Sequence, residues 1–324
     1  MKEYGGYLPL EIHTGSEYYA NTDACDIARV NSGRTALSLA IMLCNASKIY
    51  IPVYNCESVE KELKKRKIAY GFYNIDKNFM PIDVNLKPDE YLVYINYYGI
   101  APREQLRKIK EQYKNVIFDN TQAFFSQPFM DCFNCYSCRK FIGVSDGAYL
   151  IKKGIEIGKL HLGKDQSYQR AEYLLKCIDC GTNAAYADHL YSEEDIAQDI
   201  LEMSNLTRLI LSGADYERIK EKRVENFLYL HKYLATINQL DIDLTEQIPM
   251  VYPLLIADET MRAKLVENKV YIPQWWKYVL GNERSNDWER CLSQFLLPIP
   301  IDQRYNQTDM ENILKIILDK GGVQ

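Results

Sequence analysis

Three cysteines and a lysine stand close together in the segment DCFNCYSCRKFIG, residues 131–143. Cys132, Cys135 and Cys138 come at every third position, and Lys140 follows two residues later. Thiolates are ligands for zinc and for iron–sulfur clusters. A lysine amine can instead bond covalently to the carbonyl group of a cofactor. The segment is therefore either part of a metal site or a loop that presents a catalytic lysine.

The spacing of the cysteines favours the lysine. Residues three apart in a β-strand point to opposite faces and cannot converge on one ion. A further pair, Cys177 and Cys180, lies in an apolar helical pattern, where cysteine is commonly a small buried hydrophobe. We therefore expect no metal site, and a cysteine-ligated metal protein remains the alternative from another class.

A lysine that holds pyridoxal phosphate (PLP) needs two partners. A carboxylate must face the pyridine nitrogen, so that the ring stays protonated and accepts electrons. Asp119 ends the apolar segment NVIFD, and ligands of parallel sheets bind at the carboxyl ends of the strands. The phosphate needs backbone N–H groups at a helix N-terminus, and residues 31–35 (NSGRT) open a helical pattern. Phosphate loop, aspartate strand and lysine loop, in that order, predict a PLP site.

Alternating strand and helix patterns must position these groups. Three segments have apolar residues at helical spacing, and short β-rich runs lie between them. The helices are expected at 32–46, 58–68 and 103–113, and the strands at 48–54, 68–75, 91–99 and 115–120. This alternation predicts an α/β domain with a largely parallel sheet.

The second half of the chain has a different pattern. Helices are expected at 168–178, 193–211, 216–237 and 260–269, strands at 250–257 and 295–302, and a closing helix from Thr308 and Asp309 to Gly321. We expect two domains with a boundary near the long helix. Residues 1–212 would form the large α/β domain, with an N-terminal arm around GGYLPLE, and residues 213–324 a small α+β domain.

Composition narrows the function further. The 324-residue chain has a net charge of −5 and is 47% hydrophobic. Because no strongly basic face is implied, nucleic acid is not an expected partner. No apolar run is long enough to span a bilayer, and the N-terminus lacks the pattern of a secretory signal. We therefore expect a cytoplasmic protein with no membrane partner, whose nine cysteines are free thiols.

Several ordered segments resemble those of one enzyme family. They are VNSGRTALSLAI, IPVYNCESV, YINYYGI, VIFDNTQAF, YSCRKFIGVSDGAYL and EMSNL. The set is similar to the DegT/DnrJ/StrS family of PLP-dependent sugar aminotransferases. The resemblance extends over about residues 30–235 and more loosely to the end. It implies the fold-type I PLP-dependent transferase fold, in which a large α/β domain is followed by a smaller α+β domain.

The resemblance also implies residue roles. Lys140 would carry the cofactor, Asp119 would pair with the pyridine nitrogen, and Gln122 would contact the ring. The cofactor phosphate would be held by Ser137 and by the backbone of Ser32, Gly33 and Arg34. Cys56 stands where the family commonly has an aromatic residue over the ring, so the stacking would either weaken or come from another residue, with Tyr54 as the candidate.

The sequence departs from the family pattern at other places. The serine-to-lysine spacing, S-C-R-K, is shorter than the usual S-F-H-x-x-K. Arg34 replaces a common threonine, and Ile200 and Glu202 stand where Asn-x-Arg is frequent. Trp275 and Trp276 are interpreted either as the rim of a sugar-binding mouth or as core and interface aromatics.

The function implied is amino transfer. The donor would be an amino acid, with glutamate expected, and the acceptor a nucleotide-linked keto sugar destined for surface polysaccharide. The family also implies a homodimer. The alternative within the same fold is a PLP-fold protein without transaminase activity, which serves as a binding or regulatory subunit. The short lysine loop and the missing Asn-x-Arg support that alternative.

Overall fold

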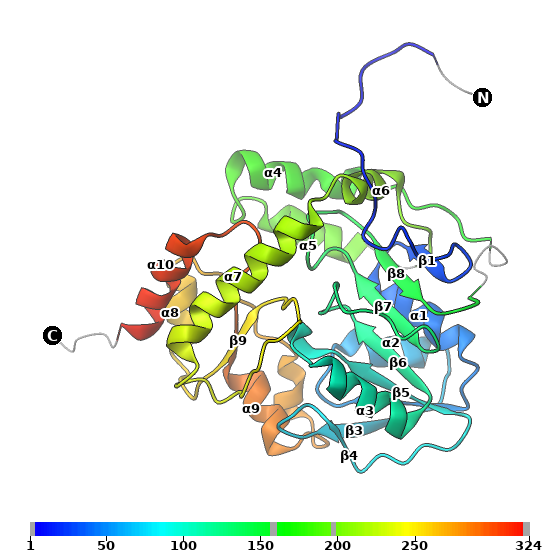
Figure 1. Ribbon diagram of the computed structural model, residues 1–324, viewed down its shortest axis with the longest axis vertical. Helices are drawn as coiled ribbons and strands as arrows, with labels where there is room; N and C mark the ends of the chain where they lie inside the picture. Colours follow the sequence, from blue (N-terminus) through cyan, green and yellow to red (C-terminus); the bar gives the residue numbers. More distant parts are fainter. Residues whose placement is uncertain (1–3, 156–160, 196–198, 320–324) are drawn as a thin grey trace.

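The computed structural model describes residues 4–155, 161–195 and 199–319. In this part of the chain an eight-stranded sheet carries helices on its faces, and a two-stranded sheet lies apart from it (Figure 1). The strands of the large sheet are β1 (Ile27–Val30), β2 (Lys48–Pro52), β3 (Tyr70–Ile75), β4 (Pro81–Ile82), β5 (Glu90–Ile95), β6 (Val116–Asn120), β7 (Phe133–Ser137) and β8 (Ala148–Ile151). Their order across the sheet is β1-β8-β7-β6-β5-β2-β3-β4.

Five strands of this sheet run in the same direction. Each neighbouring pair among β3, β2, β5, β6 and β7 is parallel. β8 is antiparallel to both β7 and β1, and β4 is antiparallel to β3. The largely parallel α/β sheet expected from the sequence is confirmed. Because parallel strands end at one edge, the residues that follow β5, β6 and β7 are brought together there.

The three helices expected in the first half are present as α1 (Gly33–Leu43), α2 (Glu57–Lys65) and α3 (Arg103–Tyr113). α1 begins where the sequence predicted. The Ser32 side chain accepts a hydrogen bond from the Thr35 N–H, and the Thr35 hydroxyl accepts one from the Ser32 N–H, which is a capping box. The buried residues Ala36, Leu37 and Ile41 of α1 face the sheet core.

The helix expected at 193–211 is wrong as a single element. In its place stand α5 (Tyr186–Asp195) and α6 (Asn205–Ser212), while α4 (Glu172–Cys180) precedes them. Between α5 and α6, Glu202 forms backbone bridges with Val30 and Lys164. Ser204 then caps α6 by accepting from the Thr207 N–H. The apolar period continues through this break, so periodicity alone could not reveal it. The part of this segment at 196–198 lies outside the described residues.

The C-terminal part packs beside the large sheet. It contains α7 (Tyr216–Leu234), β9 (Tyr252–Leu255), α8 (Met261–Glu267), α9 (Asp287–Phe295), β10 (Leu296–Ile299) and α10 (Gln307–Leu318). Among the described residues of the whole chain, short 3-10 turns occur at Tyr97–Gly99, Gln169–Ala171 and Lys277–Gly281. α7 runs along the C-terminal elements in Figure 1, and β9 pairs antiparallel with β10. α9 and the 3-10 turns were not expected. The division into domains at residues 212 and 213 stays a prediction.

The closing helix begins slightly before its expected start. α10 is capped by Asn306, two residues before the start that was predicted, and its expected stop at Gly321 lies outside the described residues. The N-terminal segment rises away from the body of the molecule (Figure 1), and its Tyr7 and Leu8 side chains are almost fully exposed. Among the described helices, none combines the length and the apolar character that crossing a membrane requires.

Candidate active site

A cavity of about 460 Å³ lies where the carboxyl edge of the large sheet meets the C-terminal part of the chain. It is lined from the sheet side by Cys56, Asp119, Thr121, Gln122 and Lys140. Its other walls come from the C-terminal part and include Arg223, Tyr271, Trp275, Trp276 and Asp302. The cavity therefore brings together residues that the sequence predicted from four separate segments.

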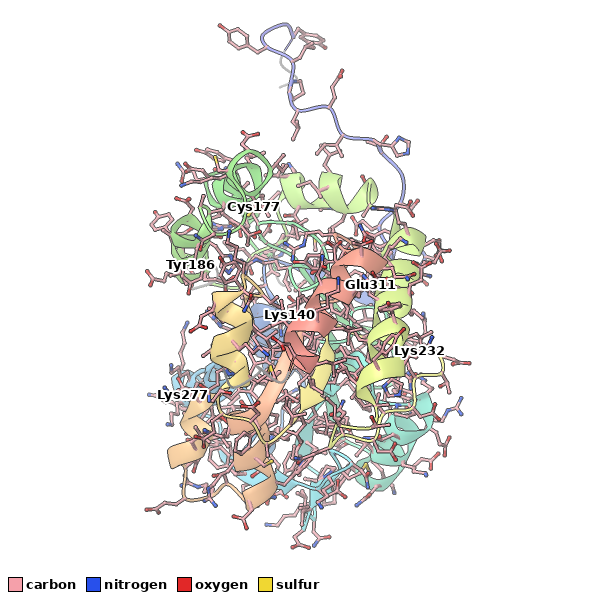
Figure 2. All side chains as sticks on the ribbon, turned by 90° about the vertical axis from the view of Figure 1, so that its left-hand side faces the viewer. Lys140, Cys177, Tyr186, Lys232, Lys277 and Glu311 are labelled. Carbon is pink, nitrogen blue, oxygen red and sulfur yellow. The ribbon has the colours of Figure 1, made fainter. Side chains whose placement is uncertain are left out.

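Lys140 follows β7 in a loop that returns to β8. Its side chain is open to the cavity, and its Nζ donates to the Thr121 Oγ1 at 3.1 Å. Figure 2 shows Lys140 toward the middle of the molecule, whereas Lys232 and Lys277 lie near the outside. Protein atoms around the ammonium group exclude water from its charged form, and this desolvation lowers the pKa of Lys140. The negative charge of Asp119 acts in the opposite direction and raises it. A lowered pKa makes the neutral, nucleophilic amine available at lower pH than for an ordinary lysine.

Asp119 occupies the carboxyl end of β6 and is nearly buried. One of its carboxylate oxygens accepts the Thr121 N–H at 2.9 Å. Thr121 thus binds Asp119 through its backbone and Lys140 through its hydroxyl. The Gln122 side chain is fixed in a similar way, since its Oε1 accepts the Tyr98 N–H at 2.8 Å. Both acidic and amide groups are therefore preorganised before any ligand enters.

The N-terminus of α1 lies beside the side chains of Thr121 and Ser137. A Cβ atom added to Gly33 would come within 2.9 Å of the Thr121 methyl and 3.4 Å of the Ser137 Cβ. The close approach requires glycine and places the first turn of α1 beside Ser137. The first N–H groups of a helix have no partner within the helix, so this corner suits a phosphate. The Ser32 hydroxyl serves as the cap, and the Arg34 side chain is exposed.

Tyr54 and Cys56 are separated by the structure. Cys56 lines the cavity, whereas Tyr54 is completely buried. The Tyr54 hydroxyl hydrogen-bonds with that of Tyr98 at 2.9 Å, and its ring meets the ring of Trp276 edge-on at 4.4 Å. Tyr54 therefore supports the wall of the cavity from behind. Trp275 and Trp276 fit both of their interpretations, because they line the cavity and also pack against the core.

The three cysteines of the 131–143 segment point in different directions. Cys132, Cys135 and Cys138 are buried in three separate hydrophobic clusters. Cys135 lies within β7, whereas Cys132 and Cys138 flank the strand at its two ends. Burial raises the pKa of Cys132 to about 11, and it also raises the pKa of Cys135 and Cys138 well above the ordinary value. Among the described residues, the one group of potential metal ligands that meet is Asp23, Cys25 and Asp26, in an exposed turn.

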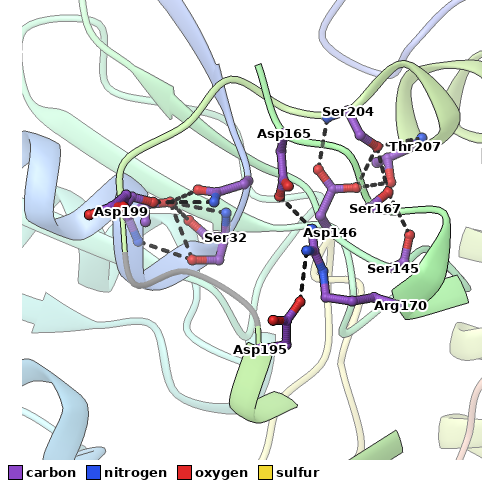
Figure 3. A network of polar contacts seen from close by, with 12 residues as sticks. Ser32, Ser145, Asp146, Asp165, Ser167, Arg170, Asp195, Asp199, Ser204 and Thr207 are labelled. Carbon is purple, nitrogen blue, oxygen red and sulfur yellow. Dashed lines mark hydrogen bonds and ion pairs between the residues drawn. The ribbon is translucent and has the colours of Figure 1, made fainter. Parts of the chain in front are cut away.

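A buried polar network fixes the end of the lysine loop (Figure 3). The Asp146 carboxylate is fully buried and accepts the Ser204 N–H at 2.8 Å and the Ser204 hydroxyl at 2.7 Å. It also accepts the Thr207 hydroxyl. Ser167 joins the network by hydrogen bonds of 2.8 Å to Ser145 and 2.7 Å to Ser204. The lysine loop is thereby attached to the N-terminus of α6.

Substituting Asp146 by alanine is expected to destabilise the fold strongly. Three buried donors would lose their acceptor, at a total cost on the order of 3 kcal/mol in the free energy of unfolding. Urea unfolding followed by circular dichroism measures this change. Asp287→Ala is the matched control, because the Asp287 side chain is exposed. Equal unfolding midpoints for the two variants would contradict the structural role of Asp146.

The sequence reasoning missed several residues of the site. Thr121 stands in the quoted segment VIFDNTQAF, between two residues that were singled out, but a threonine there carries no signal of its own. Asp146 stands a few residues after Lys140 in the quoted segment YSCRKFIGVSDGAYL, but it was assigned no role. Arg223 gave no signal either, because it is one of several cations in a charged helical pattern. Its place on the cavity depends on how α7 packs, which is a tertiary property.

The architecture is that of the PLP-dependent transferases of fold type I, and solved structures of sugar aminotransferases share it. The sugar aminotransferase CalS13 from Micromonospora echinospora is 13% identical and has a TM-score of 0.64, with 90% of this chain and 86% of that chain covered. A DegT DnrJ EryC1 StrS aminotransferase from Brucella abortus is 11% identical, with a TM-score of 0.60 and coverage of 90% and 84%.

A third structure with this fold is GDP-4-keto-6-deoxymannose-3-dehydratase with a trapped PLP-glutamate geminal diamine. It is 14% identical and has a TM-score of 0.58, with 90% of this chain and 87% of that chain covered. At these identities the likeness establishes the fold. No protein-family model and no curated protein sequence matches the chain.

Proposed function

We propose that this protein is a PLP-dependent aminotransferase that moves an amino group from an amino acid to a keto sugar. The observation that carries the proposal is the meeting of Lys140 and Asp119 in one cavity at the carboxyl edge of the sheet. Gly33, in the first turn of α1, lies close to the side chains of both Thr121 and Ser137. The three groups that PLP requires, an amine, a carboxylate and a phosphate cradle, are thus neighbours.

Each residue has a separate part in the proposed reaction. PLP, when bound, supplies an electron sink for the carbanion that forms at the donor carbon. Lys140 would hold the cofactor through its amine and would serve as the base that moves the proton at the donor α-carbon. Asp119 would be the carboxylate that pairs with the cofactor ring, and Thr121 contacts both Asp119 and Lys140. Ser137 and the N–H groups at the start of α1 would hold the phosphate.

The acceptor is proposed to be a nucleotide-linked keto sugar, and the donor glutamate. The cavity shares Tyr271 and Pro300 with a neighbouring cavity of about 510 Å³, so a long substrate could extend from one into the other. Trp275 and Trp276 offer aromatic faces for a sugar ring. A role in surface polysaccharide synthesis and a homodimeric state follow from the family resemblance alone.

Reduction with borohydride is expected to fix the cofactor on Lys140. Purified protein mixed with PLP should turn yellow, and reduction should bleach the colour and leave the cofactor mass on the peptide that contains Lys140. Visible spectra and peptide mapping by mass spectrometry measure both effects. Lys153, an exposed lysine outside the cavity, serves as the internal control. A colourless protein, or an adduct on other lysines only, would contradict the proposal.

A half-reaction separates transamination from cofactor binding alone. With glutamate added, a transaminase should convert the yellow form to the amine form of the cofactor and release 2-oxoglutarate. A protein that holds PLP on Lys140 but converts no amino acid from a broad panel would instead be the binding or regulatory subunit. Elemental analysis addresses the cysteine-ligated metal alternative.

A further inference from the structure

The paired cysteines of α4 are not buried, contrary to what an apolar helical pattern predicts. Cys177 is half-buried and Cys180 is exposed, and both are free thiols. None of the residues of α4 is buried. Figure 2 shows Cys177 in the helical layer above Lys140. The pair is therefore open to reagents in solution, unlike the three buried cysteines in and beside β7.

The two thiols stand three residues apart in the last turn of the helix. Residues at this spacing in an α-helix have Cα atoms about 5 Å apart, which follows from the rise and the radius of the helix. A disulfide joins Cα atoms about 4.4–6.8 Å apart, so the backbone spacing is suitable. The Cβ atoms of such a pair are about 5–6 Å apart, whereas a disulfide needs about 3.5–4.5 Å. The last turn must therefore tighten by about 1–2 Å for the bond to form.

The end of α4 has the freedom for this adjustment. Cys180 is the last residue of the helix, and Gly181 follows it in a left-handed conformation with a φ of 84°. A Cβ atom added to Gly181 would meet nothing within 4 Å, so there is room around this end of the helix. The Gly181 N–H donates to the Cys177 carbonyl at 3.2 Å. Because segments with few buried contacts open at low free-energy cost, this turn can change shape without unfolding the core.

Cations act on both thiols. The charge of Arg304 interacts with Cys177, and that of Lys176 interacts with Cys180. A nearby cation favours the thiolate, which is the form that attacks a disulfide. Cys25 and Cys56 are also exposed, but neither has a second cysteine close by in the sequence. The end of α4 thus combines access, a neighbouring thiol and positive charge.

We propose that Cys177 and Cys180 are a modification site, at which a small disulfide such as oxidised glutathione converts the two thiols into a reversible disulfide. The thiolate of Cys180, the more exposed residue, attacks one sulfur of the oxidant, breaks its S–S bond and releases one glutathione. The Cys177 thiolate then attacks the Cys180 sulfur of this mixed disulfide and releases the second glutathione. The protein loses two protons and two electrons, and the oxidant is reduced to two thiols.

The new bond would alter the wall of a cavity. Cys180 and Gly181 line the cavity of about 510 Å³ that shares Tyr271 and Pro300 with the cavity of Lys140. Tightening the last turn of α4 moves this wall, whereas the large sheet takes no part in the change. The modification therefore acts on the neighbouring cavity and leaves the cavity of Lys140 in place.

Tryptic peptides give a direct readout, because residues 177–208 contain both cysteines and no lysine or arginine before Arg208. The reduced protein is incubated without oxygen in glutathione buffers of rising oxidised fraction, blocked with N-ethylmaleimide in denaturant and digested. The 177–208 peptide should become two hydrogen masses lighter and lose both maleimide sites. With total glutathione at about 0.1 mM and the neighbouring thiol at a millimolar effective concentration, the closed disulfide should exceed the mixed disulfide by about tenfold.

Cys177→Ser and Cys180→Ser should each prevent closure and keep one glutathione on the cysteine that remains. Neither side chain is buried, so both variants should fold. Cys25→Ser removes an exposed cysteine elsewhere and is the matched control, which should close like the wild type. Hydrogen exchange compares the reduced and oxidised wild type. It should differ at residues 181–183 and be equal in β6.

Two results would overturn the inference. One is a 177–208 peptide that keeps both maleimide sites at the highest oxidised fraction. The other is a product made only of mixed disulfides, or of two chains joined through Cys25 or Cys56, without the closed form. Neither result bears on the borohydride adduct at Lys140, so this inference and the proposed function can fail separately.

Discussion

Lys140→Ala is expected to abolish turnover. The variant loses the amine that binds the cofactor aldehyde and the group that moves the proton at the donor carbon. Loss of a positioned acid–base group alone lowers the rate by about 10²- to 10⁴-fold, and loss of the covalent role adds to this. The measurement is a coupled assay of 2-oxoglutarate release from glutamate, with a keto-sugar acceptor present.

Lys153→Ala is the control for this substitution, because Lys153 is exposed and lies outside the cavity. Added methylamine should partly restore the proton-transfer function of Lys140→Ala, which separates a chemical defect from misfolding. The Lys140 assignment would be wrong if the alanine variant kept more than a small fraction of the wild-type rate.

Asp119→Asn is expected to slow the reaction severely without preventing PLP uptake. Asparagine has the same shape and can still accept the Thr121 N–H, so the loop should stay in place. The amide cannot keep the ring nitrogen protonated, and the carbanion at the donor carbon loses that stabilisation. Removal of one preorganised electrostatic group commonly costs about 10²- to 10³-fold in kcat.

Single-turnover kinetics with glutamate deuterated at the α-carbon would identify the affected step. A large isotope effect on the slowed reaction means that proton removal limits Asp119→Asn. Thr121→Val is a useful companion, because it removes the hydroxyl contact to Lys140 and leaves the Asp119 carboxylate unchanged. A wild-type rate in Asp119→Asn would place the pyridinium partner elsewhere.

Local signals in the sequence were sufficient for the framework of the site. The cap at Ser32, the apolar period of α1 and the β-rich run that ends at Asp119 act over a few residues, and the structure has them in place. The shared direction of the parallel strands then brings their carboxyl ends together at one edge of the sheet. Cys56, Asp119, Gln122 and Lys140 line one cavity for this reason.

Features that depend on packing between distant segments could not be predicted from the sequence. The helical period of 193–211 was interrupted because Glu202 pairs with the backbone of Val30, far away in the chain. Tyr54 turned inward because Tyr98 and Trp276 provide partners there. Arg223 reaches the cavity only through the docking of α7. In each case a contact across more than forty residues decided the outcome, and single-sequence patterns do not contain such contacts.

The pairing of β1 with β8 has a consequence for how the chain is made. Ile27 pairs with Ile151 and Val30 with Ala148. β1 therefore cannot pair until β8, which is synthesised much later, has emerged. At translation rates of about 5–20 residues per second, the roughly 120 intervening residues take about 6–24 s to appear. During that interval the apolar residues of β1 and α1 lack the residues of β8 that pack against them in the folded protein. The nascent chain is therefore open to chaperones until the lysine loop has emerged, and the cavity can form only after the last segments follow.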